Sequence, residues 1–267
     1  IDSSMVASVI ENKHVKAVTL TGSEDAGSSV AMVAGREIKK TLLELGGSDP
    51  FIVLSDANIE DCVKKGVISR FLNAGQSCIA AKRFIVDSSV YDEFIDKMLI
   101  EIKKLKLGNP MDNATNVGPL AKKEFVDEIS ELVDNSVNQG ARLLYGGKGD
   151  GSYYAPTLLV DVEEDMDVFK KETFGPVMCV SKSLSESHAI DLANNSIYGL
   201  SASLWTSDKD KALNLSRKIN SGAVFINDMS KSDPRLPFGG INKSGYGREL
   251  SELGLKEFLN VKTVVLK

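Results

Sequence analysis

Cys78 is the residue of this chain whose type and position are best suited to covalent chemistry. It lies in the run LNAGQSCIAAKR (72–83), directly after a predicted helix ends and beside a Gly-Gln-Ser turn. A thiol presented by a loop can attack a carbonyl carbon, and oriented backbone N–H groups could lower its pKa and hold an oxyanion. A bland loop cysteine is the alternative. For Cys62, inside a predicted helix, and Cys179, inside a predicted apolar strand, we predict core packing.

Glu44 is a candidate general base. It lies between leucines in LLELGGSDP and is followed by two glycines. Apolar surroundings raise the pKa of a carboxylate toward the range in which a general base works. An exposed glutamate at the end of a segment is the alternative.

Two further segments could contact a ligand. In LTGSEDAG, Gly22 and Ser23 lie between a predicted strand and helix, where free N–H groups can meet a phosphate. In KKETFGPV, Glu172 and Phe174 precede a predicted strand. The alternatives are an ordinary glycine-rich turn for the first segment, and a polar cap with a core aromatic residue for the second.

The elements that must position these residues alternate between strands and helices. Apolar runs predict strands at 18–20, 50–54, 83–87, 175–184, 200–207 and 222–227, and amphipathic spacing predicts helices at 59–72, 89–107, 122–137, 186–194, 209–219 and 251–259. This alternation is typical of an α/β fold with a mainly parallel sheet and flanking helices. In such sheets ligands bind beyond the carboxyl ends of strands, where the candidate residues lie.

Composition narrows the class of protein. Net charge is −5 with no basic stripe, which argues against nucleic acid as a partner, and no apolar run reaches the ~18 residues of a membrane span. The three cysteines lack C-x-x-C spacing, so we expect neither disulfides nor a metal site. The same sparse cysteines favour a cytoplasmic location.

Taken together, the segments resemble the aldehyde dehydrogenase superfamily over essentially the whole chain. LELGGSDPFIV resembles its general-base segment, NAGQSCIAAKR its nucleophile segment and KKETFGPV its cofactor-contact segment; INSGAVFIND and DPRLPFGGINKSGYGRE are similar to its later strand and substrate loop. The resemblance implies that Cys78 forms a thiohemiacetal and then a thioester with an aldehyde. It implies that Glu44 activates the water that releases the acid.

The resemblance also implies NAD or NADP as cofactor. Glu172 would bind the nicotinamide ribose and Phe174 would lie near the nicotinamide. The full set of implied cofactor contacts is Gly22, Ser23, Leu45, Gly46, Glu172 and Phe174.

Members of the family extend further on the N-terminal side, so we expect this chain to be a C-terminal fragment. We expect residues 1–45 to be the remnant of the NAD-binding domain and 46–244 the catalytic domain. Residues 245–259 would return toward the NAD-binding domain. VKTVVLK, at 261–267, predicts an oligomerisation strand over 260–267 that pairs with a neighbouring subunit in a homodimer or homotetramer.

For substrate, the sequence is similar to bacterial enzymes that act on succinate semialdehyde. Candidate substrate contacts are Leu72, Ser230, Ser232, Arg235 and Phe238. Many of those enzymes carry an arginine six residues before the nucleophile, where this chain has Leu72. The alternatives are another short aldehyde such as lactaldehyde, a CoA-acylating reaction, and a non-catalytic fragment or assembly domain.

Overall fold

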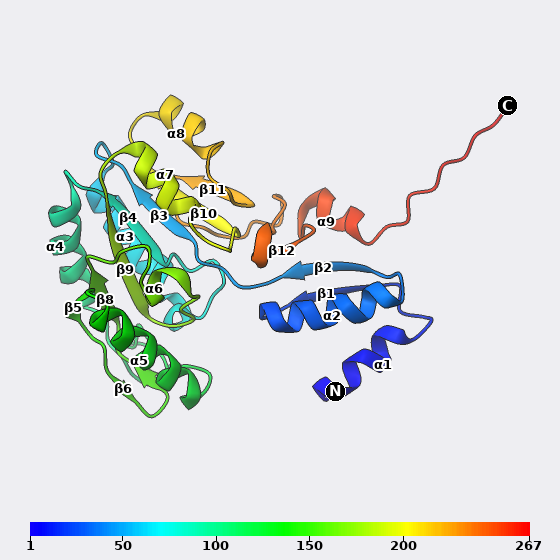
Figure 1. Ribbon diagram of the computed structural model, residues 1–267, viewed down its shortest axis with the longest axis horizontal. Helices are drawn as coiled ribbons and strands as arrows, with labels where there is room; N and C mark the ends of the chain where they lie inside the picture. The colour runs from blue at the N-terminus through cyan, green and yellow to red at the C-terminus, as the bar shows by residue number, and fades with distance from the viewer.

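The structure, a computed structural model, describes residues 1–267 and contains a large and a small sheet, each with its own helices (Figure 1). The strands are β1 (Ala17–Thr21), β2 (Lys40–Glu44), β3 (Pro50–Val53), β4 (Arg83–Asp87), β5 (Arg142–Tyr145), β6 (Gly149–Asp150), β7 (Tyr153–Tyr154), β8 (Thr157–Val160), β9 (Val177–Ser183), β10 (Ser201–Trp205), β11 (Ala223–Ile226) and β12 (Gly245–Tyr246). The α-helices are α1 (Val6–Glu11), α2 (Glu24–Arg36), α3 (Ile59–Phe71), α4 (Tyr91–Ile102), α5 (Lys123–Asn138), α6 (Asp167–Lys170), α7 (Glu186–Asn194), α8 (Lys209–Ser216) and α9 (Ser251–Glu257).

The large sheet has the strand order β11-β10-β3-β4-β9-β8-β5, in which only β5 runs antiparallel to its neighbour. The small sheet has the order β1-β2-β12, with β1 and β2 parallel and β12 antiparallel to β2. A short β6–β7 hairpin stands apart from both. These sheets confirm the predicted α/β class with a mainly parallel sheet and flanking helices.

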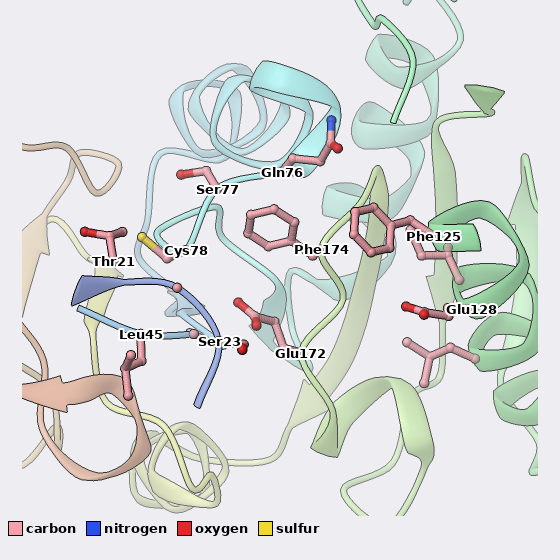
Figure 2. Close-up of a pocket in the computed structure, with 14 residues that line it drawn as sticks. Thr21, Ser23, Leu45, Gln76, Ser77, Cys78, Phe125, Glu128, Glu172 and Phe174 are labelled. Carbon is pink, nitrogen blue, oxygen red and sulfur yellow. The ribbon is translucent and has the colours of Figure 1, made fainter. Parts of the chain in front are cut away.

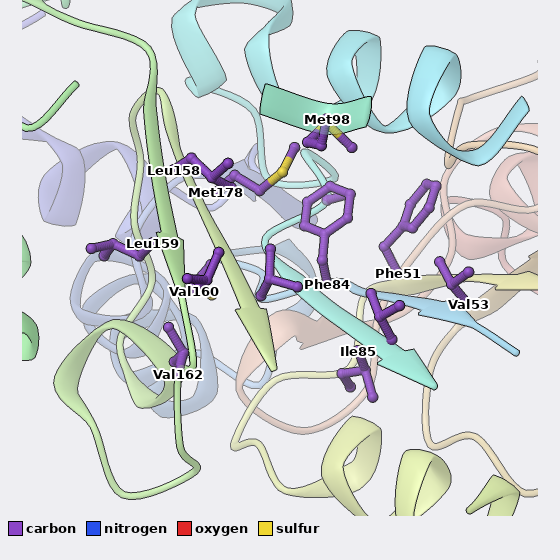
Figure 3. Packing of buried hydrophobic residues seen from close by; sticks show 14 of the residues in the cluster. Phe51, Val53, Phe84, Ile85, Met98, Leu158, Leu159, Val160, Val162 and Met178 are labelled. Carbon is purple, nitrogen blue, oxygen red and sulfur yellow. The ribbon is translucent and has the colours of Figure 1, made fainter. Parts of the chain in front are cut away.

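The core lies on both faces of the large sheet. Along β4, Phe84 points toward Met98 of α4 and Ile85 points to the opposite face, as the two-residue period of a strand requires (Figure 3). On the Phe84 side, Gly66 lets α3 approach closely, because an added Cβ would stand 3.0 Å from Phe84 Cε1 and 3.1 Å from Met98 Cε. Both faces of the sheet are therefore buried, which explains the continuous apolar runs of the sequence.

The two sheets meet where β2 ends. The chain passes from β2 to β3 through residues 45–49, all of them buried. Ser244, just before β12, accepts a hydrogen bond from the N–H of Leu45 through its carbonyl at 3.1 Å, and its hydroxyl donates to the carbonyl of Gly46 at 2.6 Å. The segment just before β12 therefore packs against the connection between the sheets. The domain limits given above, at residues 45, 244 and 259, stay a proposal.

Most predicted elements are found, and the largest difference inside the body is at α4. The helix was expected at 89–107 but spans Tyr91–Ile102. Beyond it the chain forms tight turns, and Lys106 bonds to Asn116 on both sides: its N–H donates to the Asn116 side chain and its carbonyl accepts from the Asn116 N–H. These bonds draw the chain out of the helix and into the Leu107–Val117 bridge.

The predicted strand at 260–267 is absent in the isolated chain. Residues 258–267 form no helix or strand, and the chain extends away from the body with Val261 90% and Leu266 92% exposed (Figure 1). A strand requires a partner for its backbone hydrogen bonds, and no strand of the same chain lies beside this segment. No helix of the structure combines the length and apolar character needed to cross a membrane.

Candidate active site

A cavity of about 740 Å³ opens beside the end of β2 and brings Cys78 together with the predicted cofactor residues. In Figure 2, Glu172 and the Phe174 ring lie between Cys78 on one side and Phe125 and Glu128 on the other. The predicted residues that line the cavity with Cys78 are Gly22, Ser23, Leu45, Gly46, Glu172 and Phe174. Residues from segments far apart in the sequence therefore form one site.

Cys78 lies in a tight loop that follows α3, residues 73–80, here called the nucleophile turn. Asn73, Ala74 and Gly75 have φ values of 53°, 55° and 73°, so three successive residues are left-handed. This conformation is unfavourable for residues other than glycine. The turn then closes through a bond from the Ala80 N–H to the Ser77 carbonyl at 3.1 Å, and the N–H of Cys78 has no acceptor within the chain. That N–H is free to hold an oxyanion.

The surroundings raise the pKa of the Cys78 thiol to about 11, chiefly through burial and then through the negative charges of Asp49, Glu44 and Glu172. The N–H of Ile79 opposes this effect weakly. A backbone N–H therefore lowers this pKa as expected, but burial and the three carboxylates outweigh it. Cys62 and Cys179 are both 0% exposed, and all three cysteines are free.

Two glycines after Glu44 allow Glu172 and Cys78 to approach the same peptide. A Cβ at Gly46 would stand 2.6 Å from Glu172 Oε2, and a Cβ at Gly47 would stand 2.2 Å from the carbonyl oxygen of Cys78. The N–H of Gly47 donates to Glu172 Oε1 at 2.9 Å, and Lys82 Nζ donates to the Gly47 carbonyl at 3.1 Å. Only glycine fits at these positions without moving the site.

Glu44 lies at the end of β2, is 2% exposed, and accepts no hydrogen bond from the chain on either carboxylate oxygen. Burial raises its pKa to about 7, with a further increase from Glu249 and an opposing effect of Arg248. A carboxylate with this pKa is half ionised near neutral pH, as a general base requires. Gly239, of the predicted substrate loop, packs against it: a Cβ there would stand 2.8 Å from Glu44 Oε1.

The residues around the cavity fit a nicotinamide dinucleotide. Ser23 caps the thirteen-residue helix α2, whose N-terminus can receive a pyrophosphate. Glu172 Oε2 accepts no bond from the chain, so it is available to a ribose hydroxyl, and the Phe174 ring is 43% exposed in the cavity wall. No group of three metal-ligating side chains lies close enough to hold a metal ion.

The predicted substrate contacts lie outside this cavity. The Ser230 hydroxyl is buried and bonded to the Ser201 hydroxyl, whereas Ser232 is exposed. The Arg235 side chain is 85% exposed and pairs with Asp233 at 2.6 Å. Leu72 is 63% exposed at the end of α3, and Phe238 is half-buried and pairs with the backbone of Glu249. Their contacts with a substrate stay predictions.

Sequence reasoning missed two parts of the site. The far wall of the cavity is α5, through Phe125, Glu128, Ile129 and Leu132, and Thr21 completes the near side. The sequence of α5 showed an amphipathic pattern, but it gave no signal that one face of the helix lines a cavity. Arg70 was also missed, although a signal existed: it follows Val63 by seven residues and Val67 by three, which places a charged residue on the apolar face of α3.

Comparison with known proteins agrees with this geometry. The family model described as "Aldehyde dehydrogenase family" matches residues 2–264. The chain is 49% identical to succinate-semialdehyde dehydrogenase [NADP(+)] of Mycobacterium avium (strain 104) over 99% of its length. It is also similar to the structure of succinic semialdehyde dehydrogenase from Streptococcus pyogenes in complex with NADP+, with 41% identity and a TM-score of 0.96 over 100% of this chain and 59% of that one. The chain is also similar to the solved structure of a protein called Gox0499. Here the identity is 45% and the TM-score is 0.97, over 100% of this chain and 59% of that one.

The chain spans 57% of the length of the Mycobacterium avium relative. The range matched by the family model includes the segments that carry Glu44, Cys78 and Glu172. The chain therefore belongs to the aldehyde dehydrogenase family.

Proposed function

We propose that the protein oxidises an aldehyde to a carboxylic acid with NADP or NAD, and that Cys78 is the nucleophile. The observation that carries this proposal is the meeting of Cys78 and all six predicted cofactor residues around one cavity. The Mycobacterium avium and Streptococcus pyogenes relatives are named as succinate-semialdehyde dehydrogenases that use or bind NADP, which favours NADP as cofactor and succinate semialdehyde as substrate.

In the first half of the reaction, the Cys78 thiolate adds to the aldehyde carbon and forms a thiohemiacetal. The carbonyl oxygen becomes an oxyanion, and the free N–H of Cys78 is the donor from this chain that holds it. The bound cofactor supplies the hydride acceptor. Loss of the hydride from the thiohemiacetal carbon leaves a thioester on Cys78.

In the second half, Glu44 takes a proton from a water molecule that attacks the thioester. The carboxylic acid leaves and the thiolate returns to Cys78. Splitting the oxidation into two steps is the advantage of covalent catalysis. The pKa of about 7 for Glu44 lets it accept a proton at neutral pH and release it to solvent afterwards.

Glu172 and Phe174 would hold the nicotinamide end of the cofactor. Glu172 Oε1 is fixed by the Gly47 N–H, so Oε2 points to the cavity in a defined orientation for the ribose hydroxyls. Gly22 and Ser23, at the start of α2, would receive the pyrophosphate.

The substrate loop offers Ser232 and Arg235 to the distal carboxylate of succinate semialdehyde. Arg235 already pairs with Asp233, so the substrate would share or replace that pair. The tail at residues 260–267 presents exposed apolar side chains with unpaired backbone, and we propose that it pairs with a neighbouring subunit in a homodimer or homotetramer.

Selective alkylation tests the nucleophile. In the complete encoded protein, iodoacetamide should modify Cys78 faster than Cys62 or Cys179, because both of those thiols are 0% exposed. Mass spectrometry of peptides gives the three rates separately. Cys78→Ala should abolish aldehyde oxidation, with Cys62→Ala as the matched control that retains it. Turnover by Cys78→Ala would exclude the mechanism.

A panel of aldehydes, run with NADP and with NAD, tests the substrate. We expect the highest kcat/KM for succinate semialdehyde with NADP, and a raised KM for that substrate alone in Arg235→Ala. Equal values for succinate semialdehyde and an uncharged aldehyde of the same length would contradict the assignment of a carboxylated substrate.

A further inference from the structure

Arg70 is a buried guanidinium that bonds to two neighbouring segments of the proposed site, the one that carries Cys78 and the one that carries Phe174. It lies in the last turn of α3, is 0% exposed, and makes no salt bridge within the 4.0 Å limit for ion pairs. All its hydrogen bonds go to backbone carbonyls. Burial of a guanidinium without a directly paired carboxylate is costly, and the carbonyls that it binds are its hydrogen-bonding compensation.

Two of these carbonyls flank Cys78. Nη2 donates to Gly75 at 2.9 Å, three residues before the nucleophile, and Nη1 donates to Ala81 at 3.2 Å, three residues after it. The nucleophile turn contains the left-handed residues Asn73 and Ala74, and such strain persists only where surrounding contacts hold it. Arg70 therefore bonds to the left-handed part of that turn at Gly75 and to Ala81, the residue that directly follows the turn.

The other two carbonyls flank Phe174. Nη2 also donates to Thr173 at 3.1 Å and to Gly175 at 2.5 Å. The two segments are in close contact at this point, because a Cβ at Gly75 would stand 2.3 Å from the Gly175 carbonyl oxygen and 2.5 Å from Arg70 Nη2. One side chain therefore connects the backbone of the nucleophile turn with the backbone of the Phe174 segment (residues 172–175).

We infer that Arg70 is a positioning residue that couples cofactor binding to the nucleophile: a cofactor seated against Phe174 and Glu172 fixes the orientation of Cys78 through the four carbonyls that share this guanidinium. The inference rests on the proposed function, since it takes Cys78 as the nucleophile and Phe174 as a cofactor contact. Coupling of this kind is reciprocal, so the state of Cys78 must also change the affinity for the cofactor.

Arg70→Lys tests the coupling because it keeps the charge but replaces the planar five-donor fork by a single ammonium. The matched control is Arg83→Lys. Arg83 is also buried and bonds only backbone carbonyls, those of Ser48, Leu192, Ala193 and Asn195, none of them in the nucleophile turn or the Phe174 segment. Both variants lose buried bonds of the same kind, so a general loss of stability affects both.

The measurement is the iodoacetamide rate of Cys78 in the complete encoded protein, with saturating NADP+ and without cofactor. In the wild type the two rates should differ. In Arg70→Lys we expect the effect of NADP+ on the alkylation rate to be roughly tenfold smaller, so that the ratio of the two rates lies closer to one. Tenfold is the size expected when a charge-assisted hydrogen bond is lost. The Kd for NADP+ should then no longer depend on alkylation of Cys78. Arg83→Lys should keep the wild-type ratio, although its Tm also falls.

The outcomes separate the two proposals. If Arg70→Lys keeps the wild-type ratio while both variants lose stability equally, Arg70 is only structural and the inference fails, with the proposed function intact. If wild-type Cys78 reacts no faster than Cys62 and Cys179, the proposed function fails and the inference fails with it.

Should Arg70→Lys not fold, hydrogen exchange in the wild type decides. The amides of Ile79, Ala80 and Ala81 do not line the cavity, yet they should gain protection with those of Thr173–Gly175 when NADP+ is added. Protection limited to Thr173–Gly175 would overturn the coupling.

Discussion

Replacing Glu44 by glutamine tests both the identity of the base and the pKa that the structure gives it. The carboxylate is 2% exposed and its pKa is raised to about 7, first by burial and then by Glu249. A group with that pKa is roughly one-tenth ionised at pH 6 and roughly nine-tenths ionised at pH 8. Thioester hydrolysis should therefore become about tenfold faster between these pH values. An ordinary glutamate, with a pKa of about 4.3, would give almost no change.

Rapid mixing with an aldehyde and NADP+ separates the two half-reactions. The burst of NADPH reports formation of the thioester, and the steady rate reports its hydrolysis. Glutamine has nearly the same shape as glutamate but accepts no proton, so Glu44→Gln should keep the burst and lose a factor of about 10² to 10⁴ in the steady rate. The remaining rate should no longer rise between pH 6 and 8.

Glu249→Gln is the matched control for the pKa. It keeps the base but removes the carboxylate that adds to the increase in the Glu44 pKa, so the midpoint of the steady-rate profile should shift to lower pH. If Glu44→Gln keeps the steady rate of the wild type, the assignment of Glu44 as the base is refuted. The assignment is also refuted if the steady rate of the wild-type enzyme stays constant from pH 6 to 8 while the burst persists.

The same substitution has an independent readout in stability. The pKa of Glu44 is raised from 4.5 to about 7 in the folded state, so the folded state binds the proton more tightly than the unfolded state. The free energy of unfolding therefore falls as pH rises through this window. Glutamine does not ionise, so the variant does not lose this stability as the pH rises. The Tm of Glu44→Gln minus that of the wild type should therefore be larger at pH 8 than at pH 5. A difference in Tm that is the same at both pH values would contradict the raised pKa.

The remaining predictions concern close packing, the thiol and the tail. Gly47→Ala should reduce turnover strongly, measured as kcat, because its Cβ would lie 2.2 Å from the Cys78 carbonyl oxygen; Gly35→Ala, with open space around it, is the control. Alkylation of Cys78 without cofactor should keep accelerating up to about pH 11, and a plateau below pH 8 would contradict the raised thiol pKa. Deletion of residues 260–267 should lower the mass measured by light scattering, and an unchanged mass would exclude the tail from assembly.

Most of the fold could be predicted from the sequence because each element carries a local signal. The strand at Arg83–Asp87 and the helix at Glu186–Asn194 lie at the predicted residues, one as a continuous apolar run and the other beginning at the N-cap Ser185. The tail is the exception. Its apolar, β-branched composition predicts a strand, but strand formation depends on a partner that the chain itself does not supply.

The candidate site was predictable only in part. Glu44, Cys78 and Glu172 could be proposed from the sequence because each lies in a segment that contains glycines. The net direction of the Cys78 pKa shift could not be predicted, because it depends first on burial and then on three carboxylates from segments distant in sequence. Arg70 shows the same limitation: spacing places it on a buried face, but only the folded chain reveals which carbonyls it meets.

The raised pKa of Cys78 has a consequence for the order of events. With a pKa of about 11, roughly one thiol in ten thousand is ionised at pH 7, so the resting thiol is nearly inert. A positive charge beside Cys78 offsets the carboxylates that suppress its ionisation. Oxidised nicotinamide carries such a charge, and in the proposed binding mode it would lie beside Phe174. Cofactor should therefore bind before aldehyde.

The same electrostatics favour Glu44 as the base only after the thioester has formed. An acylated Cys78 carries no negative charge, so Glu44 then has one fewer anion that opposes its ionisation. While Cys78 is a thiolate, its negative charge opposes ionisation of Glu44. Glu44 then stays protonated and cannot accept a proton from water. In the proposed mechanism, nucleophile and base are therefore ionised in alternation, because the negative charge of Glu44 is one of the causes that raise the pKa of Cys78, after burial and Asp49.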